Sequence, residues 1–437
     1  MTSDPNERLS KLAATFRDLE AYVQQEKIRV IHYGVGAIGA EVVRALLNNP
    51  EFEIVGAIDA SAAKAGKDLG DAAGIGHTLG IPVAYDPESL LTDTYADVVV
   101  HCTGSSLTEV YPQLMSIVAA EKSIISSCEE LAFPWVRFPE ISQKLDRRAK
   151  ETGVRVLGTG VNPGFVMDML PMMMATASQQ VKSVHIERIL DVSTRRIQLQ
   201  RKAGVGLSTS GFQQAASAGA VGHVGLRESA LMIADSFGWR MDDVSETLEP
   251  VIARERRKNE YFVVEKGYTL GLRQSARGIV SGQEVVRLDL EMSLGANDPH
   301  DLVEINGTPP IRAVIQGGIQ GDAATAAIIA NCLPAIARSR LTGLLSMRDL
   351  PALPYVRPRS QQRDEELAPT RTPREGPLRF TRGQPGSGRS SVVAGRTRKG
   401  TLKMVLHIGP RVQKVQLALI KNTARLVVVN ESDISAR

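Results

Sequence analysis

The segment GVGAIG, residues 34–39, restricts the fold of this chain more than any other feature. It follows the apolar run KIRVIHY and opens the helical stretch AIGAEVVRALLNN. Glycines spaced G-x-G-x-x-G at a strand-to-helix turn allow a sharp turn, close approach of a phosphate to the backbone, and close packing of helix on strand. We therefore expect this turn to bind a dinucleotide, with the pyrophosphate at the helix N-terminus.

The pattern around this turn predicts an α/β fold. Short apolar runs alternate with amphipathic helical stretches up to residue 160, and the further strand candidates read FEIVGAID, ADVVVHCTG, KSIISS and VRVLG. Apolar strands that alternate with helices are typical of a parallel sheet covered on both faces. We predict an N-terminal Rossmann-type, doubly wound parallel sheet over residues 27–160.

The pattern changes after this domain. Longer alternating strands with few helices between them predict an α+β substrate and dimerisation domain with a mixed sheet over residues 161–320. Residues 321–355 are predicted to be helices that return to the first domain. Residues 356–400, rich in Arg, Pro, Gly and Ser, are expected to form a disordered basic linker. Residues 1–26 read as a leading amphipathic helix, and residues 401–437 as a strand-like C-terminal extension.

Composition narrows the classes of function. The 52 basic and 48 acidic residues are too balanced to favour nucleic-acid binding by the whole chain. Three cysteines, far apart and without CxxC spacing, argue against a disulfide framework or a zinc site and favour a cytoplasmic location. The charged N-terminus does not resemble a signal peptide. No run of about 18 apolar residues is present, so we expect no membrane partner.

Asp59 bears on the choice of cofactor. It ends the second strand, 20 residues after Gly39, where a carboxylate can accept hydrogen bonds from the adenosine ribose. A carboxylate there repels a 2′-phosphate, which favours NAD, although the nearby Lys64 leaves NADP possible. The loops that follow the parallel strands complete the expected cofactor site: Gly34, Val35, Gly36, Ala37, Ile38, Gly39, Asp59, Cys102, Thr103, Gly104, Ser127, Cys128 and Asn162.

The corner GTGVNPG, residues 158–164, follows the last strand of this domain. Its glycines let the backbone turn close to a ligand, because a residue without Cβ leaves room for it. Asn162 can bond the nicotinamide carboxamide or the substrate. The helix that follows, MDMLPMMM, is more typical of adaptable core packing than of a cofactor site.

Several longer motifs resemble one family. AGKDLGDAAG (65–74), SSCEELAFP (126–134), GTGVNPGFVMDMLP (158–171), GHVGLRESALMIADSFGW (222–239) and GDAATAAIIANCLPAI (321–336) occur in this order. Together they resemble the 2,4-diaminopentanoate dehydrogenases and native amine dehydrogenases, within the dihydrodipicolinate-reductase-like group. The resemblance covers about residues 27–354. It implies NAD(P)-dependent oxidative deamination of a primary amine or 2,4-diamino acid to the ketone, reversible with ammonia, and no metal.

The resemblance also implies a catalytic residue, Glu109, in the first turn of a helix that follows a cofactor-facing strand. A carboxylate there can stabilise an ammonium or iminium charge and pass a proton to water. The alternative is a structural role, since Ser106 and Glu109 have the S-x-x-E spacing of a capping box. We expect Trp135 and Asn162 to contact the substrate as well, although Trp135 could equally be core.

Other polar residues have an ordinary structural interpretation. Cys128 is expected to pack beside the cofactor rather than to act as a nucleophile. His185 fits a hydrogen-bonded position in a sheet. The pair Arg195 and Arg196 could grip a substrate carboxylate or lie in a solvated turn.

Two further functions compete with the amine dehydrogenase hypothesis. One is imine reduction of the dihydrodipicolinate reductase type, although VHIERILDVSTRR lacks the lysine and the Pro-Ser-Gly turn of those reductases. The other is a non-catalytic dinucleotide-binding sensor. For any of the three, we expect a homodimer formed through the second domains.

Overall fold

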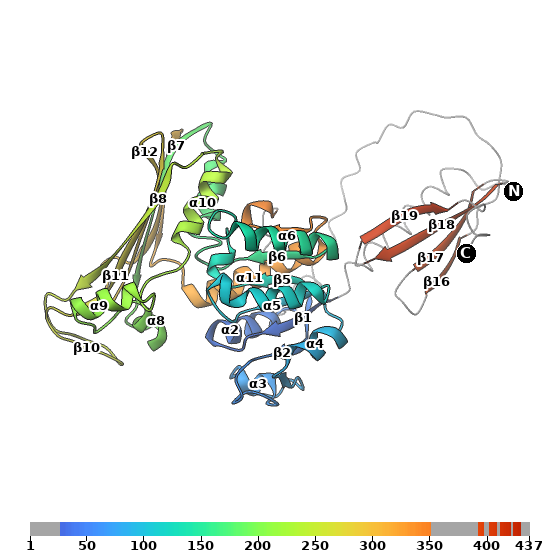
Figure 1. The fold of residues 1–437 in the computed structure, drawn as a ribbon, viewed down its shortest axis with the longest axis horizontal. Helices are drawn as coiled ribbons and strands as arrows, with labels where there is room; N and C mark the ends of the chain where they lie inside the picture. Colours follow the sequence, from blue (N-terminus) through green and yellow to red (C-terminus); the bar gives the residue numbers. More distant parts are fainter. Residues whose placement is uncertain (1–26, 351–391, 397–401, 409–410, 421–422, 430–437) are drawn as a thin grey trace, which may run out of the picture. The chain divides into compact units, whose positions relative to one another are not determined.

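The computed structural model describes residues 27–350 and the strand segments 392–396, 402–408, 411–420 and 423–429. The chain divides into two compact units, and one of them, Lys27–Arg359, contains the glycine-rich turn and both large sheets (Figure 1). The predicted leading helix over residues 1–26 lies outside the described residues. Among the described residues, no helix combines the length and apolarity needed to cross a bilayer.

A seven-stranded parallel sheet forms the first domain, which confirms the predicted Rossmann-type fold. Its order is β15-β6-β5-β4-β1-β2-β3, so the sheet grows outward from β1 in both directions, as in dinucleotide-binding folds. The strands are β1 (Ile28–Tyr33), β2 (Phe52–Ile58), β3 (Val83–Ala84), β4 (Val98–His101), β5 (Ser123–Ser126), β6 (Arg155–Gly158) and β15 (Gly343–Leu345).

Helices cover both faces of this sheet because consecutive strand residues point to opposite sides. Val30 belongs to the apolar cluster shared with α2 and α11, whereas its neighbour Ile31 belongs to the cluster shared with α5 and α6. The helices of this domain are α2 (Ala37–Leu47), α3 (Leu69–Ala72), α4 (Pro87–Asp93), α5 (Leu107–Ala119), α6 (Pro139–Thr152) and α11 (Gly321–Arg338), with short 3₁₀ turns η1 (Glu129–Leu131) and η2 (Met347–Asp349).

A six-stranded mixed sheet forms the second domain, also as predicted. The pair β7 and β12 is parallel and the remaining pairs are antiparallel. In sheet order the strands are β14 (Ile311–Gln316), β13 (His300–Thr308), β7 (Gln180–Asp191), β12 (Gln283–Ser293), β11 (Thr269–Val280) and β8 (Asp243–Ile252).

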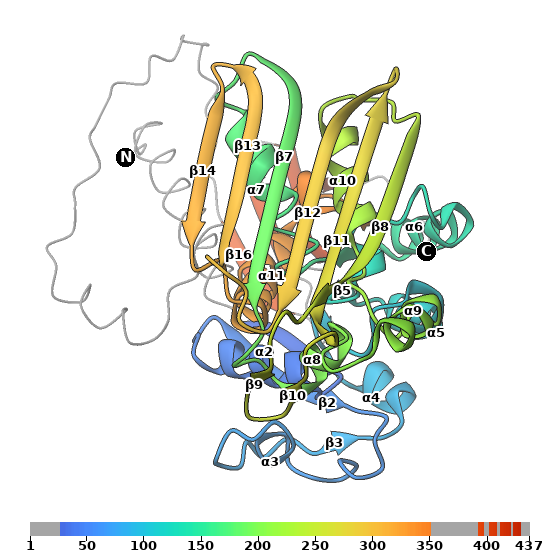
Figure 2. The ribbon, with the colours of Figure 1, turned by 90° about the vertical axis from the view of Figure 1, so that its left-hand side faces the viewer.

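The helices of the second domain lie mainly on one face of its sheet. Figure 2 shows α7 and α10 behind the strands, which leaves the other face uncovered by the described residues. The helices are α7 (Met169–Ala175), α8 (Ile197–Lys202), α9 (Thr209–Ser217) and α10 (Leu226–Ser236), and β9 (Arg257–Lys258) and β10 (Val263–Val264) form a small hairpin.

Beyond the second domain the chain returns to the first, as α11 and then as β15, which pairs with β6. The last described segments form a four-stranded antiparallel sheet of β16 (Val392–Arg396), β17 (Leu402–Ile408), β18 (Arg411–Ile420) and β19 (Thr423–Val429). Strand β16 falls inside the segment expected to be a disordered linker. The rest of that linker lies outside the described residues.

Candidate cofactor and substrate cleft

The glycine-rich turn between β1 and α2 has the geometry that a dinucleotide needs. Gly34 has φ of +100°, and a Cβ there would lie 2.5 Å from the Cys102 carbonyl oxygen. A Cβ on Gly39 would collide with the Gly34 carbonyl oxygen, so this glycine lets α2 pack against β1. Nothing lies within 4 Å of the corresponding point on Gly36, the N-cap of α2. The open space above Gly36, at a helix N-terminus, fits a pyrophosphate.

Asp59 lies beside this turn at the end of β2. Its carboxylate accepts hydrogen bonds from the backbone N–H of Val35 at 2.7 Å and of Ser61 at 2.9 Å, and it pairs with Lys64 Nζ at 3.0 Å. The Lys64 ammonium also donates to the Val35 carbonyl at 2.7 Å. Asp59 therefore holds the glycine-rich turn in place, together with the Lys64 ammonium, which contacts the same residue, Val35.

A cleft of about 390 Å³ lies next to the turn, between the two domains. The first domain contributes the start of α2 and the ends of β4, β5 and β6, as expected for a ligand at the carboxyl edge of an open sheet. The second domain contributes β7, β12 and α8. The cleft is lined by Gly36, Ala37, Ile38, Cys102, Thr103, Gly104, Ser105, Ser127, Glu129, Thr159, Gly160, Val161, Asn162, Pro163, Arg188, Leu190, Arg195, Arg196, Gln198, Leu199, Lys202, His223, Leu290, Met292, Gly321, Asp322 and Thr325.

The corner after β6 is one wall of this cleft. Gly164 has φ of +128°, and a Cβ there would lie 2.4 Å from the backbone nitrogen of Gly160. The buried Asp168 carboxylate accepts hydrogen bonds from the backbone N–H of Gly164 at 2.7 Å and of Met169 at 2.6 Å, and from the Ser229 hydroxyl at 2.8 Å. These bonds hold the tight turn that presents Asn162 to the cleft.

Several polar atoms in the cleft have no hydrogen-bond partner. Thr159 Oγ1, Asn162 Oδ1 and His223 Nε2 are all buried and unpartnered among the described residues. An unpaired buried polar group costs about 1–3 kcal/mol. Three such atoms around one cleft indicate a ligand that supplies their partners.

Thr103 is held by a partly buried hydrogen-bond network. Its hydroxyl contacts His101 Nε2 at 2.8 Å and donates to Gln113 Oε1 at 2.7 Å. The other nitrogen of the His101 ring lies 2.8 Å from the Ser126 hydroxyl. Burial lowers the pKa of His101 to about 4, so this ring is neutral near pH 7. The network fixes one cleft hydroxyl at the end of β4.

The cleft carries an excess of positive charge. Four cations and two carboxylates line it. Three of the cations have carboxylate partners: Arg188 with Asp301 at 2.8 Å, Arg196 with Asp322 at 3.1 Å, and Lys202 with Glu129 at 3.9 Å. Arg195 is the fourth cation, and no described carboxylate pairs with it. A Cβ on Gly321 would lie 2.9 Å from Arg195 Nη2, so that glycine leaves room for the guanidinium.

The predicted cofactor residues fall into two groups. Eight of them line the cleft: Gly36, Ala37, Ile38, Cys102, Thr103, Gly104, Ser127 and Asn162. The other five do not: Gly34, Val35, Gly39, Asp59 and Cys128. Gly34, Val35, Gly39 and Asp59 shape or hold the glycine-rich turn. Cys128 is buried with its thiol 3.1 Å from the Ser105 carbonyl oxygen, and burial raises the pKa of that thiol far above its ordinary value.

Trp135 does not reach the cleft, contrary to the expectation that it contacts the substrate. In the segment that follows η1, the Trp135 and Phe133 rings pack edge to face at 5.0 Å. Both rings line a different cavity that also includes Leu341 and Met241.

Glu109 is exposed in the first turn of α5 and is not among the cleft-lining residues. The alternative structural role, a capping box with Ser106, is not formed, because the Ser106 side chain makes no capping bond. The Glu130 side chain caps α5 instead. Its carboxylate accepts a hydrogen bond from the backbone N–H of Leu107 at 2.8 Å and forms an ion pair with Arg137 at 3.1 Å. Glu109 therefore has no capping role in α5.

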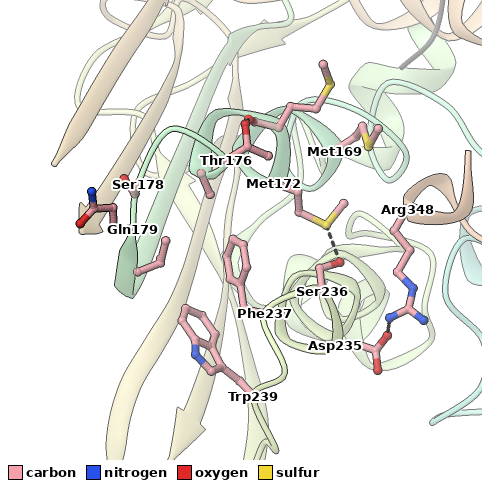
Figure 3. A pocket seen from close by; sticks show the side chains of 13 residues that line it. Met169, Met172, Thr176, Ser178, Gln179, Asp235, Ser236, Phe237, Trp239 and Arg348 are labelled. Carbon is pink, nitrogen blue, oxygen red and sulfur yellow. Dashed lines mark hydrogen bonds and ion pairs between the residues drawn. The ribbon is translucent and has the colours of Figure 1, made fainter. Parts of the chain in front are cut away.

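The Met-rich helix α7 faces a second cavity, of about 630 Å³, rather than the cleft (Figure 3). Met172 accepts a hydrogen bond from Ser236 on α10, and Arg348 pairs with Asp235 at the edge of the cavity. The Phe237 and Trp239 rings pack edge to face at 4.9 Å. Methionine and aromatic side chains thus form much of this cavity at the edge of the core. Helix α7 therefore has the packing role that the sequence favoured.

His185 has the structural role that the sequence favoured. Its ring nitrogens lie 3.0 Å from Asp289 and 3.2 Å from Glu304, on the uncovered face of the second sheet. Among the described residues, no group of His, Cys, Asp or Glu side chains could hold a metal ion.

Sequence reasoning missed the cleft residues Thr159, Arg188, Lys202 and His223. Arg188 and His223 come from the second domain, more than a hundred residues from the glycine-rich turn. One signal was present: His223 lies between two glycines with positive φ, Gly222 and Gly225, within the motif GHVGLRES. Such glycines mark a backbone that must turn sharply beside something.

The fold and the cleft define a class of protein: a two-domain dinucleotide-dependent oxidoreductase with its ligand site between a Rossmann domain and a mixed-sheet domain. Residues 28–127 match the model of the dihydrodipicolinate reductase N-terminus. Residues 165–363 match the 2,4-diaminopentanoate dehydrogenase C-terminal domain.

Comparison of this chain with individual relatives shows the family to which it belongs. The chain is 33% identical to the 2,4-diaminopentanoate dehydrogenase of Acetoanaerobium sticklandii over 339 residues, which is 75% of this chain and 94% of that protein. An amine dehydrogenase structure from Mycobacterium smegmatis superposes with a TM-score of 0.68 at 25% identity, over 76% of this chain and 98% of the other. The amine dehydrogenase of Streptomyces virginiae is 25% identical over 173 residues, 38% of this chain and 47% of that protein. The chain belongs to the 2,4-diaminopentanoate dehydrogenase family.

Proposed function

We propose that this protein oxidises the 4-amino group of a short 2,4-diamino acid, such as 2,4-diaminopentanoate, with NAD as the preferred cofactor. Oxidation removes hydride from the carbon and a proton from its nitrogen, which leaves an imine. Water then adds, and ammonia leaves to give the ketone. Reductive amination of the ketone with ammonia is the reverse reaction.

The observation that carries this proposal is the unpaired guanidinium of Arg195 in the cleft. A cation without a carboxylate partner in a cleft favours an anionic ligand group, and guanidinium matches a carboxylate with two parallel hydrogen bonds. The substrate carboxylate is therefore assigned to Arg195, and Lys202 also lines the cleft. A simple amine would leave this charge unpaired.

NAD would supply the hydride acceptor for this reaction. The turn at Gly34–Gly39 would hold its pyrophosphate, and Asp59 its adenosine ribose. The cleft-lining stretch Cys102–Ser105 would contact the nicotinamide end. These residues fit the cofactor because Gly36 leaves open space at the N-terminus of α2 and Thr159 presents an unpartnered polar atom.

Glu109 is proposed as the carboxylate that stabilises the charge on the reacting nitrogen and passes a proton to water. It follows directly after the cleft-lining stretch Cys102–Ser105. Gln113, one turn further along the same face of α5, accepts the hydrogen bond of the cleft residue Thr103. This proximity supports a position at the cleft rim.

Two properties of the whole protein are proposed with this function. A cytoplasmic location agrees with three free cysteines, Cys102, Cys128 and Cys332. A homodimer through the second domains agrees with the uncovered face of the six-stranded sheet (Figure 2).

The test of the reaction is NADH formation from 2,4-diaminopentanoate compared with 2-aminopentane, which lacks the carboxylate. We expect wild-type protein to favour the diamino acid in kcat/KM by about 10²-fold or more, the scale of a charged hydrogen-bonded contact. Arg195→Met should remove most of that preference. Arg201→Met is the matched control, because Arg201 is exposed on the same helix region and does not line the cleft.

Three results would contradict the proposal. Binding of NADH without turnover of any amine would favour a sensor. Equal use of both amines by wild-type protein would remove the role of Arg195. Reduction of a cyclic imine dicarboxylate with no amine oxidation would favour the reductase function.

A further inference from the structure

His223 enters the cleft on a backbone that is clamped from both sides. The backbone N–H of His223 donates to Gln274 Oε1 at 2.8 Å, and Gln274 Nε2 donates back to the His223 carbonyl at 2.8 Å. Gln274 lies on β11 and is itself buried. One side chain thus fixes both backbone groups of a residue that lines the cleft, so the position of its ring is strongly constrained.

The two nitrogens of the His223 ring have different surroundings. A hydrogen-bonding interaction with the Asn162 backbone acts to raise the pKa of the ring, whereas Nε2 is buried without a partner among the described residues. Because Nε2 has no partner, we assign this interaction to Nδ1, which then carries the proton and donates it to the backbone carbonyl. Burial, together with the charges of Lys202 and Arg188, lowers the pKa of His223 to about 3. The ring is therefore neutral near pH 7, and Nε2 is a bare acceptor.

Asn162 supplies a second bare acceptor to the same cleft. Its side-chain Nδ2 donates to Met167 Sδ at 3.2 Å, which leaves Oδ1 as the free atom. Asn162 Oδ1 is buried and unpartnered, like His223 Nε2. Two acceptors without donors are costly to keep in a buried site, and a group with several N–H donors would satisfy both.

The charged residues of the cleft narrow the identity of that group. Arg195 is the unpaired cation, suited to a carboxylate. Glu129 lines the cleft as well, with Lys202 at 3.9 Å from its carboxylate. A cation for the carboxylate, two neutral acceptors and a carboxylate for the ammonium are what an amino-acid head group requires.

Resting on the proposed function, we propose that His223, with Asn162, recognises the 2-amino group of the substrate and so makes the enzyme specific for 2-amino acids. His223 Nε2 and Asn162 Oδ1 accept hydrogen bonds from that nitrogen while Arg195 binds the carboxylate. His223 is a specificity residue and takes no part in the oxidation at C4. An amine that carries the carboxylate but lacks the 2-amino group would leave both acceptors unpaired.

The experiment measures binding rather than turnover. Protein saturated with NAD is titrated by calorimetry with 2-aminopentanoate and with pentanoate, which differ only in the 2-amino group and cannot be oxidised at C4. We expect wild-type protein to bind 2-aminopentanoate at least about tenfold more tightly, the scale of one or two hydrogen bonds to a charged group.

Two substitutions of His223 distinguish the loss of the Nε2 acceptor from a general loss of structure. His223→Asn keeps a donor for the Asn162 carbonyl at the position of Nδ1 and removes the acceptor at Nε2. It should bring the affinity ratio of the two ligands close to one, with pentanoate binding little changed. His223→Gln places an amide oxygen near the position of Nε2 and should restore most of the ratio. His185→Asn is the control, because His185 is a paired histidine on the far face of the second sheet.

Several outcomes would overturn the proposal. One is a wild-type protein that binds 2-aminopentanoate and pentanoate equally, or binds neither. Another is a His223→Asn protein that keeps the wild-type affinity ratio. A third is a His223→Asn protein that loses affinity for both ligands together. A loss of NAD affinity with an unchanged ratio would also do so, because the acceptors would then serve the nicotinamide carboxamide. A protein that still prefers 2-aminopentanoate to pentanoate but oxidises no diamino acid would refute the proposed reaction. The proposed binding site for the 2-amino group would then still stand.

Discussion

Asp59 is the residue that we propose distinguishes the two nicotinamide cofactors, but it is not a free carboxylate. It receives two backbone N–H bonds and the Lys64 ammonium, which partly neutralises it. Its pKa is lowered below the ordinary value; burial opposes this shift, and the bonds from Ser61, Lys64 and Val35 outweigh it. The ionised form therefore persists throughout the neutral range and repels a 2′-phosphate.

The substitution Asp59→Ala should shift preference from NAD towards NADP, because it removes the repelling charge and leaves Lys64 to meet the 2′-phosphate. We expect the ratio of kcat/KM values for NAD and NADP to fall by about tenfold or more, the scale of one charged contact. Asp71→Ala, an exposed acid on the following helix, serves as the control. An equal loss for both cofactors would mean that Asp59 acts only through the shape of the turn.

Glu109 and Glu129 allow a direct comparison of two carboxylates near one cleft. Glu129 lines the cleft and pairs with Lys202, whereas Glu109 is exposed, and no ion pair or hydrogen bond with a described side chain is found for it. If Glu109 stabilises the developing iminium, Glu109→Gln should lower kcat by about 10²-fold or more. NAD affinity should hardly change. Near-normal kcat in this variant, with a large loss in Glu129→Gln, would transfer the role to Glu129.

A residue of the site could be predicted from the sequence when it acts within one local turn, and not when it reaches the cleft from a distant part of the chain. Gly34, Gly36 and Gly39 act within one turn, so their spacing between an apolar strand and a helix was enough to predict a dinucleotide-binding turn. Arg188 and His223 reach the same cleft from the second domain, and only the packing of that domain decides which of its polar residues face inward. For Trp135 the sequence left substrate contact and core packing open, and the ring lines a different cavity, because the path of the chain after η1 cannot be read from the local pattern.

At the scale of the element, helix α5 shows how a long-range contact replaces a local signal. The sequence pattern offers Ser106 as its cap, but Glu130, 23 residues further on, accepts the N–H of Leu107. Glu130→Ala should therefore destabilise the protein by about 1–2 kcal/mol, the usual cost of a lost helix cap. Ser106→Ala should change the free energy of unfolding by less than about 0.5 kcal/mol. Urea unfolding measures both, and equal losses would contradict the assignment of the cap.

The strands of the parallel sheet were the most predictable elements. Strands β1, β2, β4, β5 and β6 each coincide with a short, mainly apolar run, because both faces of the sheet are covered by helices. Strand β15 was missed: it has three residues and joins β6 from almost 190 residues further along the chain. No local pattern distinguishes so short a strand from a loop.

At the scale of the whole molecule, the uncovered face of the six-stranded sheet is the surface on which we base the proposed homodimer. It carries a network of ion pairs around Asp289, which contacts His185, Arg277 and Arg287 within 3.1 Å. Hydrogen bonding to Asp289 raises the pKa of His185 above its ordinary value, so its charge persists nearer to neutral pH. A face with charges of both signs can pair with itself about a two-fold axis, since each charge then meets its opposite on the second copy.

We therefore expect a homodimer that buries this face. Ile189 lies in the middle of the sheet, in register with Glu291 on β12 and next to His300 on β13. The substitution Ile189→Lys places a cation beside Glu291, which a single subunit tolerates, but it puts two ammonium groups into a symmetric interface, where desolvation is costly. Sedimentation at micromolar concentration should give about twice the 47.2 kDa chain mass for wild-type protein and the monomer mass for the variant. Tyr85→Lys, a change at an exposed residue of the first domain, should leave the dimer intact. A wild-type monomer, or a variant that remains fully dimeric, would show that this sheet face is not the interface.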